Sequence, residues 1–392
     1  MSLSLSERTL RIKPSATLAV NAKAKEMERE GIDIINLSVG EPDFPTPASI
    51  KKAGIAAIEN NVTGYTATDG IRELKQAIIE KFKRDNHLDY DLSEILVTPG
   101  AKQALYNAIM ALLNPEDEII IPAPYWVSYP AMAKLADANP VIITADHTQN
   151  FKITAKQLNA AITNKTKMVV INSPSNPTGM AYTADELIAL GKILREQPNI
   201  AILVDDIYEY ILWSTDTFVS FLNVNPDLRN RTILVNGASK AYSMTGWRIG
   251  YSAAPKIITQ AMEKVQSHSA SCACSISQMA AMAAFKIPKS ELQFMYDSFQ
   301  KRHDLLLNGL NAIPGIVTKP ADGAFYVYPY VQEIITKHKL KDDIELANFL
   351  LEKTHVATVP GSAFGTPGYL RFSCAAREEH LIEAIKRLQK AL

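Results

Sequence analysis

Short apolar runs alternate with amphipathic stretches through the middle of the chain, and this alternation predicts the architecture. Each run is rich in Val and Ile and is bounded by Pro, Asn, Gly or Asp, which is typical of buried strands. We assign these strands to residues 95–98, 118–122, 141–144, 168–172, 201–204, 232–236 and 249–253. Strands that are apolar throughout and alternate with helices imply a mostly parallel sheet that is covered on both faces.

Helical patterns fill the intervals between these strands. In one of them Thr183 is followed three residues later by Glu186, which fits a capping box at a helix start. The intervals predicted to be helical are residues 102–113, 129–136, 154–162 and 183–195. The middle of the chain is therefore expected to be an α/β unit with seven strands between helices.

The two ends of the chain have a different pattern, in which longer helices accompany only short strands. We expect helices at residues 17–30, 291–310, 343–353 and 378–392, and strands near residues 324–328, 357–359 and 369–373. This predicts a large domain over residues 48–290 and a smaller α+β domain that is assembled from residues 1–47 and 291–392.

Composition narrows the classes of protein that fit this architecture. The 392 residues include 41 Lys and Arg and 41 Asp and Glu, so the formal net charge is zero. This balance argues against nucleic acid as a partner and against a polybasic membrane anchor. No run of about 18 apolar residues occurs, and the N-terminal stretch lacks the apolar segment of a secretory signal. We therefore expect a cytoplasmic protein that does not interact with membranes.

Several common signatures are absent from the sequence. Only three cysteines occur, and none forms a CxxC pair, which argues against a disulfide framework and a Cys-ligated zinc site. The sequence contains no GxGxxG after a strand, GxxxxGK[ST], GxSxG or HExxH. The usual motifs of dinucleotide oxidoreductases, P-loop enzymes, serine hydrolases and zinc proteases are thus missing, and we expect no metal.

Candidate chemistry gathers where the predicted strands end, because ligands of open α/β sheets bind at the carboxyl ends of the strands. After the strand at residues 95–98, the segment 98–103 opens a helix with small residues, which suits an anion site. Lys102 lies in the first turn of that helix, where a cation opposes the helix dipole. This placement makes sense mainly if an anion binds there.

Three further strand ends carry polar residues. Pro174 and Pro177 hold Asn176 in an irregular turn, Asp205 ends an apolar strand, and Lys240 follows another strand. Each has an ordinary alternative as a loop or surface residue. Together with a basic residue such as Arg248 for a phosphate, they supply an amine nucleophile, an acid for a ring nitrogen and a donor for a ring oxygen. These are the groups that pyridoxal 5'-phosphate requires.

With these motifs in view, the chain resembles the class I/II aminotransferases of pyridoxal-phosphate fold type I over essentially its whole length. The likeness is greatest to bacterial aspartate aminotransferases of the subgroup with KPSAT near the N-terminus. The matching stretches are residues 13–24, 40–47, 100–105, 124–130, 172–179, 205–209, 239–251, 323–327, 359–365 and 369–373. This resemblance implies a homodimer with shared active sites, whose substrates are amino acids and 2-oxo acids.

The resemblance also implies roles for residues around the cofactor ring. Lys240 matches the lysine that forms a Schiff base with the cofactor and moves a proton at the substrate α-carbon. Asp205 matches the acid that keeps the pyridine nitrogen protonated. Tyr208 and Asn176 match the donors to the ring's phenolate oxygen, and Trp126 matches the aromatic residue that stacks on the ring.

A phosphate site is implied in the same way. Tyr65 matches a tyrosine that reaches the phosphate of the neighbouring subunit. The other phosphate-binding residues implied are Gly100, Ala101, Lys102 and Arg248. Many relatives have Ser or Thr three residues before the Schiff-base lysine, but here that position is Gly237. Its side-chain contact is therefore missing, and Ser239 is the candidate to replace it.

For the substrate, the resemblance assigns Arg371 to the α-carboxylate, helped by Asn176 and the backbone of Gly40. In this subgroup a lysine at the position of Lys102 resembles the anchor for a side-chain carboxylate, which favours aspartate, glutamate and their oxo acids. Some relatives also accept prephenate, and Lys13 with the N-terminal segment could serve that role. The sequence leaves the two substrate ranges open.

Other functions remain as alternatives. An aromatic or branched amino-acid aminotransferase would use the same cofactor site, as would a lyase of this fold type. A non-enzymatic regulator that binds pyridoxal phosphate would carry an aminotransferase-like domain behind a DNA-binding domain. We expect no such domain, because the aminotransferase motifs start by residue 13 and the net charge is zero.

Overall fold

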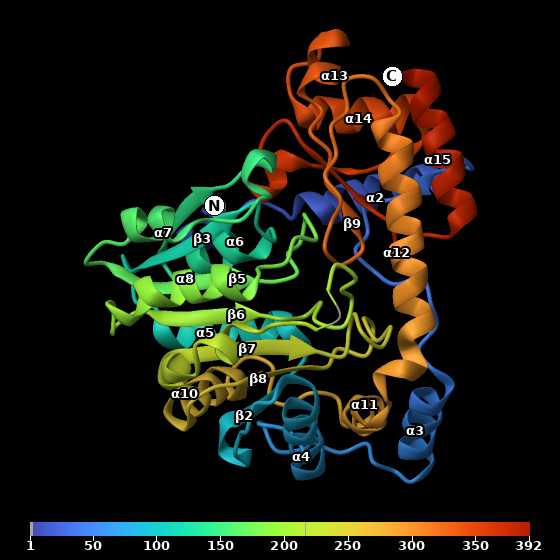
Figure 1. The fold of residues 1–392 in the computed structure, drawn as a ribbon. Helices are drawn as coiled ribbons and strands as arrows, with labels where there is room; N and C mark the ends of the chain where they lie inside the picture. Colours follow the sequence, from blue (N-terminus) through green and yellow to red (C-terminus); the bar gives the residue numbers. More distant parts are fainter. Residues whose placement is uncertain (1–2, 216) are drawn as a thin grey trace.

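A seven-stranded sheet forms the centre of the computed structural model, which describes residues 3–215 and 217–392 (Figure 1). Its strands are β2 (Ile95–Thr98), β3 (Glu118–Ala123), β4 (Asn139–Thr144), β5 (Thr166–Asn172), β6 (Ala201–Asp205), β7 (Thr232–Gly237) and β8 (Gly250–Ala253). They lie in the order β2-β8-β7-β6-β5-β3-β4. β8 is antiparallel to both of its neighbours, and the other pairs are parallel. The seven predicted strands are thus confirmed.

Both faces of the sheet are buried, which explains why its strands are apolar throughout. In β5, Met168 and Val170 belong to one core, whereas Val169 and Ile171 belong to the other. The first core includes residues of α5 (Ala101–Leu112), α6 (Ser128–Leu135) and α10 (Lys256–Ser267). The second includes residues of α4 (Arg72–Lys81), α7 (Ala155–Ala161), α8 (Ala184–Arg195) and α11 (Ser275–Lys286). Successive side chains of a strand point to opposite faces, so each apolar run feeds both cores.

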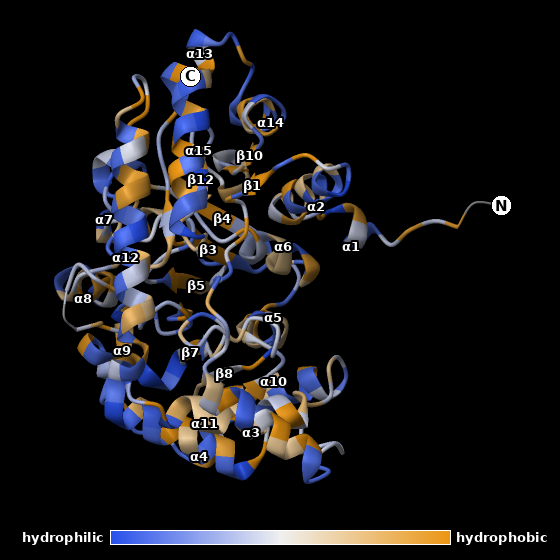
Figure 2. Cartoon of the chain, turned by 90° about the vertical axis from the view of Figure 1, so that its right-hand side faces the viewer, coloured by the Kyte–Doolittle hydropathy of each residue, from blue (hydrophilic) through white to orange (hydrophobic). Residues whose placement is uncertain are grey.

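Segments from the two ends of the chain lie together beside this sheet. β1 (Ile35–Asn36) pairs in parallel with β10 (Val356–Ala357), and β12 (Leu370–Ser373) lies between β11 (Val359–Pro360) and β9 (Tyr326–Val327). The accompanying helices are α2 (Ala16–Arg29), α12 (Lys289–Asn311), α13 (Gln332–Lys337), α14 (Asp343–Thr354) and α15 (Glu378–Ala391). Hydrophobic and hydrophilic positions alternate along α12 and α15, as expected for helices with one buried side (Figure 2). The division into domains at residues 47/48 and 290/291 stays a prediction.

The local details agree with the sequence pattern in most places. The predicted capping box is present, since the Thr183 hydroxyl accepts the Glu186 N–H at 3.3 Å. The predicted strand at 357–359 is two strands, because Thr358 separates a pairing with β1 from a pairing with β12. Further helices that the pattern did not assign are α1 (Glu7–Leu10), α3 (Ala48–Glu59) and α9 (Phe221–Val224), besides α4, α10, α11 and α13.

The helices also bear on membrane association. Within the part of the chain that the structure describes, no helix combines the length and the apolar character that crossing a bilayer requires.

Candidate active site

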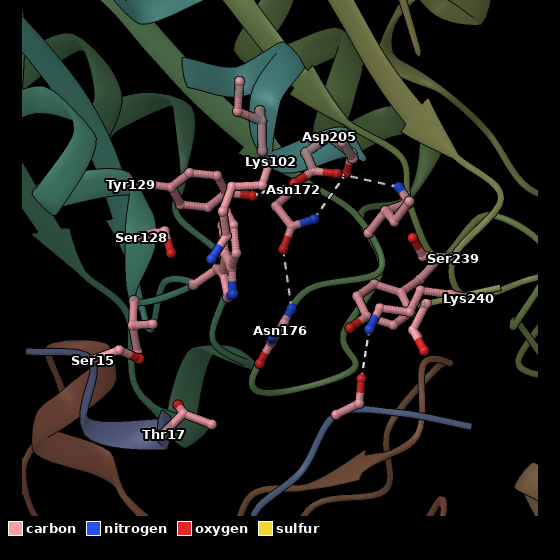
Figure 3. A pocket seen from close by; sticks show the side chains of 18 of the residues that line it. Ser15, Thr17, Lys102, Ser128, Tyr129, Asn172, Asn176, Asp205, Ser239 and Lys240 are labelled. Atoms are coloured by element: carbon pink, nitrogen blue, oxygen red, sulfur yellow. Dashed lines mark hydrogen bonds between the residues drawn. The ribbon is translucent and has the colours of Figure 1, made fainter. Parts of the chain in front are cut away.

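A cavity of about 310 Å³ lies where the carboxyl ends of β5, β6 and β7 meet segments from both ends of the chain. Figure 3 shows Lys240, Asp205 and Asn176 around it, with Ser15 and Thr17 across the cavity from Asp205. Its lining includes the following residues singled out from the sequence: Gly40, Ala101, Lys102, Trp126, Asn176, Asp205, Tyr208, Ser239, Lys240, Arg248 and Arg371. Residues that are up to 331 positions apart in the sequence are thus brought to one place.

Asp205 is the last residue of β6 and its carboxyl group is buried at one end of the cavity. One carboxyl oxygen accepts the Tyr129 hydroxyl at 2.6 Å, and the other accepts the Ile207 N–H at 3.3 Å. Burial raises the pKa of Asp205 to about 6, and these two hydrogen bonds oppose the rise. The group is therefore held near the midpoint of its titration at slightly acid pH.

Lys240 follows β7, and its partly buried side chain lies against the loop after β1. Its Nζ donates to the Gly40 carbonyl oxygen at 2.5 Å, and no carboxylate forms an ion pair with it among residues 3–215 and 217–392. Burial lowers the pKa of Lys240 to about 8, although the charge of Glu41 opposes this change. A substantial neutral fraction near pH 8 suits an amine that acts as a nucleophile and a base.

The start of α5 and Arg248 form a compact cationic corner. Gly100, the N-cap of α5, has a φ of +87°, and a Cβ there would lie 2.3 Å from Arg248 Nη2. A Cβ at Gly250 would likewise lie 2.1 Å from the Ala101 nitrogen. Glycine at both positions lets the guanidinium and the free N–H groups of α5 approach each other, which suits a phosphate group. Gly100 itself does not line the cavity but shapes this corner.

Gly237 is the position at which this chain departs from many relatives. A Cβ there would lie 2.9 Å from the Ile249 carbonyl oxygen, so the backbone of β8 leaves little room for a larger residue. Ser239 lines the cavity two residues later. The expectation that it replaces the missing contact remains a prediction.

Arg371 lies in β12 and only 2% of its surface is exposed. Its guanidinium donates to the Asn176 side-chain oxygen at 2.9 Å and to the Ser38 carbonyl oxygen at 2.6 Å. Its Nε–H has no partner, and no carboxylate pairs with the group within the described ranges. Burial lowers its pKa from the ordinary value. An isolated buried cation at a cavity wall is well suited to bind a carboxylate ligand.

Lys102 and Trp126 make a second place for a carboxylate. Lys102 Nζ lies 5.0 Å from the centre of the Trp126 ring, in a cation–π contact. Burial, followed by repulsion from Arg248, lowers the pKa of Lys102. The lysine again has no ion-pair partner among the residues that the structure describes. The cavity thus carries two separate cations that could hold the two ends of a dicarboxylic acid.

Two tyrosines of the cavity were missed as site residues by the sequence analysis. Tyr129 and Tyr326 both lie within matching stretches, but neither was given a role. Tyr326 in β9 is buried, and its hydroxyl lies 2.8 Å from that of Tyr208. Spacing could have indicated Tyr129, because it follows Trp126 by only three residues, at the start of α6. Nothing local in the sequence indicates the Tyr326 contact.

The N-terminal segment also contributes more than expected. Ser15, Thr17 and Leu18, at the start of α2, line the cavity, whereas Lys13 does not. Tyr65 lies outside the cavity and is 96% exposed in the single chain. Its expected contact is with a neighbouring subunit, so that role remains a prediction. No group of three His, Cys, Asp or Glu side chains in the described ranges is placed to hold a metal ion.

This architecture and site define a class. Residues 32–388 match the sequence profile of the family described as aminotransferase class I and II, and the chain belongs to this family. The likeness extends to particular proteins. The chain is 50% identical to an aspartate/prephenate aminotransferase of Nitrosomonas europaea, with 100% of both chains covered. It is 47% identical to an aspartate aminotransferase of Rhizobium meliloti, over 96% of this chain and 93% of that one.

Solved structures show the same relationship. The aspartate aminotransferase of Rhizobium meliloti superposes with a TM-score of 0.95 at 45% identity, covering 100% of this chain and 99% of that one. The Thermus thermophilus aspartate aminotransferase with maleate superposes with a TM-score of 0.94 at 39% identity, covering 100% of both. The predicted fold class and family are thus confirmed.

Proposed function

We propose that this chain is an aspartate aminotransferase that uses pyridoxal 5'-phosphate. It would transfer the amino group of L-aspartate to 2-oxoglutarate, giving oxaloacetate and L-glutamate. The observation that carries the proposal is one cavity that holds a partly buried lysine, a buried aspartic acid and two cations without carboxylate partners among the described residues. The names of the relatives, which include aspartate and aspartate/prephenate aminotransferases, support it.

The residues present fit the cofactor. Arg248 and the N-terminus of α5, with Gly100, Ala101 and Lys102, would hold its phosphate. Asp205 would face the ring nitrogen, and its anionic form is favoured by a positive charge there. The remaining residues we assign to the cofactor are Tyr65 of a second copy, Trp126, Asn176, Tyr208, Ser239 and Lys240. When bound, the cofactor supplies an electron sink that stabilises negative charge at the substrate α-carbon.

The chain itself supplies binding and proton transfer. Arg371 would bind the α-carboxylate, with Asn176 and the backbone of Gly40 beside it. Lys240 Nζ would remove the proton from the substrate α-carbon and deliver it to the cofactor during the same half-reaction. Its lowered pKa suits this work, because the neutral amine is the form that accepts a proton. In the first half-reaction the amino acid would leave its amino group in the site and depart as an oxo acid. In the second, another oxo acid would take up that amino group, so the exchange is balanced.

Aspartate is favoured over apolar amino acids by Lys102. This cation lies in the cavity beside Trp126, separate from Arg371, and could pair with the side-chain carboxylate. The Thermus thermophilus relative has a structure with maleate, a four-carbon dicarboxylic acid. The same charges would also accommodate prephenate, which is a dicarboxylic acid, so an aspartate/prephenate range is the second candidate. We further propose a cytoplasmic homodimer with shared active sites, in which Tyr65 reaches the second subunit's phosphate site.

The test is a panel of single half-reactions, in which aspartate, glutamate, phenylalanine and alanine meet the aldehyde form of the bound cofactor and prephenate, an oxo acid, meets its amine form. Rapid spectral conversion by aspartate and glutamate, with stoichiometric formation of their oxo acids, is the expected result. Borohydride reduction before digestion should leave the pyridoxyl group on the peptide with Lys240. Elimination products without amino-group exchange would instead indicate a lyase, and absence of any conversion would favour a non-enzymatic protein.

A further inference from the structure

We propose that Tyr326 is a positioning residue, which couples the arginine for the substrate α-carboxylate to the phenol that faces the cofactor ring oxygen. The inference rests on the proposed function. It starts from a buried residue in β9 that lines the cavity and lies at the meeting point of three site residues. None of the roles assigned above uses it.

The contacts of Tyr326 are close on three sides. Its hydroxyl lies 2.8 Å from the Tyr208 hydroxyl, and its ring centre lies 4.5 Å from the Arg371 guanidinium carbon. A Cβ on Gly40 would lie 2.1 Å from the Tyr326 hydroxyl oxygen, so only glycine allows the loop to pass there. The phenol is therefore fixed between the ring-oxygen donor, the carboxylate-binding arginine and the loop that accepts the Lys240 hydrogen bond.

The two phenols form a short chain whose direction matters. Burial raises the pKa of both Tyr208 and Tyr326, so both stay protonated at neutral pH. Tyr326 is the only hydrogen-bond partner that the Tyr208 hydroxyl has within residues 3–215 and 217–392. If Tyr326 donates to Tyr208, the proton of Tyr208 is free to point into the cavity. A phenol that accepts one hydrogen bond is a stronger donor in the next, because such chains polarise one another.

Arg371 sets the strength of this chain. The charged and titratable groups that face Tyr326 are Arg371 and Cys374 from the segment of β12, and Tyr208 from the turn after β6. The charge of Arg371 opposes the rise in the pKa of Tyr326 and makes it a better donor. A carboxylate bound to Arg371 would cancel part of that charge. Donation from Tyr208 would then weaken, and the cofactor site would bind its proton more tightly once substrate is present.

The experiment follows the visible absorption of the cofactor-loaded protein against pH, with and without maleate, which has two carboxylates and no amino group. In Tyr326→Phe the pH midpoint should rise by about 0.5–1 unit, the equivalent of one hydrogen bond. The shift that maleate causes should be smaller than in the wild type. Tyr90→Phe is the matched control, because Tyr90 is a buried tyrosine whose hydroxyl has no partner within the described ranges. Its midpoint should equal that of the wild type.

A double-variant cycle separates the relay from a packing defect. In a Tyr208→Phe background, adding Tyr326→Phe should leave the midpoint unchanged, because the chain is already broken at Tyr208. An unchanged midpoint in folded Tyr326→Phe, or an equal effect in both backgrounds, would overturn the relay while the proposed function stands. A wild type that forms no pH-dependent visible band with the cofactor contradicts the proposed function, and the relay with it.

Discussion

Two clusters of charged side chains among the described residues, one in the core and one at the cavity, differ in whether their charges are paired. Lys81 forms an ion pair with Glu209, and Asn86 bonds to both, accepting from Lys81 at 2.7 Å and donating to Glu209 at 2.8 Å. In the cavity, Lys240 and Arg371 donate only to carbonyl and amide oxygens of the described residues. The first cluster is complete without a ligand, whereas the second leaves positive charge for one to neutralise.

Two neighbouring acids, Asp205 and Asp206, also differ in whether they face the cavity. Asp206 accepts a hydrogen bond from Ser220 at 2.6 Å, away from the cavity, and burial raises its pKa well above the ordinary value. Asp205 accepts from Tyr129 and lines the cavity. Successive residues at a strand end point to opposite sides, so only one of two identical side chains can meet a ligand. The carboxyl group that lines the cavity is the one with an assignable chemical role.

The largest expected effect comes from removing the unpaired lysine. Lys240→Met should lower kcat/KM for aspartate by about 10⁴-fold or more, because both nucleophile and base are lost. The free energy of unfolding without cofactor should rise at pH 7, since burial disfavours this charge. Steady-state kinetics and urea denaturation of the cofactor-free protein check the two parts. Full activity in the variant would refute the site as a whole.

The paired lysine should behave in the opposite way. Lys81→Met leaves the Glu209 carboxylate buried without its cation, which should lower the free energy of unfolding by roughly 3–5 kcal/mol. The double variant Lys81→Met/Glu209→Gln should recover most of this loss, because the stranded charge is gone. Thermal and urea unfolding measure both. Equal stability of Lys81→Met and the wild type would show that the two clusters do not differ as argued.

These differences bear on what the sequence could predict. The seven strands and the residues at their carboxyl ends follow from local patterns. Each strand is a short apolar run, and the residues that bound it lie directly beside it in the sequence. Asp205 and Lys240 could be selected on that basis. Their partners could not, since the Tyr129 and Gly40 contacts join positions 76 and 200 residues apart. Likewise, Lys81 and Glu209 are 128 residues apart, and no local signal distinguishes this paired lysine from an exposed one.

A pH titration of stability tests Asp205, the acid of the unpaired cluster. Its pKa is about 6 in the folded protein against 3.8 ordinarily. Between these values the folded protein holds a proton that the unfolded chain has lost, so stability falls as pH rises through this window. The wild type without cofactor should lose about 3 kcal/mol relative to Asp205→Asn between pH 3 and pH 8, most of it between the two pKa values. Tyr129→Phe removes an opposing hydrogen bond and should move the window to higher pH.

If the difference in the free energy of unfolding between the wild type and Asp205→Asn did not change with pH, this assignment would be contradicted. Urea denaturation at closely spaced pH values provides the measurement, and the Asn variant keeps the size of the side chain. Asp206→Asn is the matched control, because it changes the neighbouring acid that does not face the cavity. Only the Asp205 variant should also change cofactor affinity.

The smallest expected effect concerns Lys102, an exposed cation that lines the cavity. Lys102→Ser should raise KM for aspartate about 10–100-fold, since a hydrogen bond to a charged group contributes about 1.5–3 kcal/mol. KM for phenylalanine should change little, because that side chain carries no carboxylate. The exposed Lys134 of α6 offers a control variant that removes a nearby positive charge outside the cavity. Equal changes in the KM values for aspartate and phenylalanine would show that Lys102 does not bind the side-chain carboxylate. Lys102 would then serve the cofactor phosphate alone, and Arg371 would be the cation that binds the substrate.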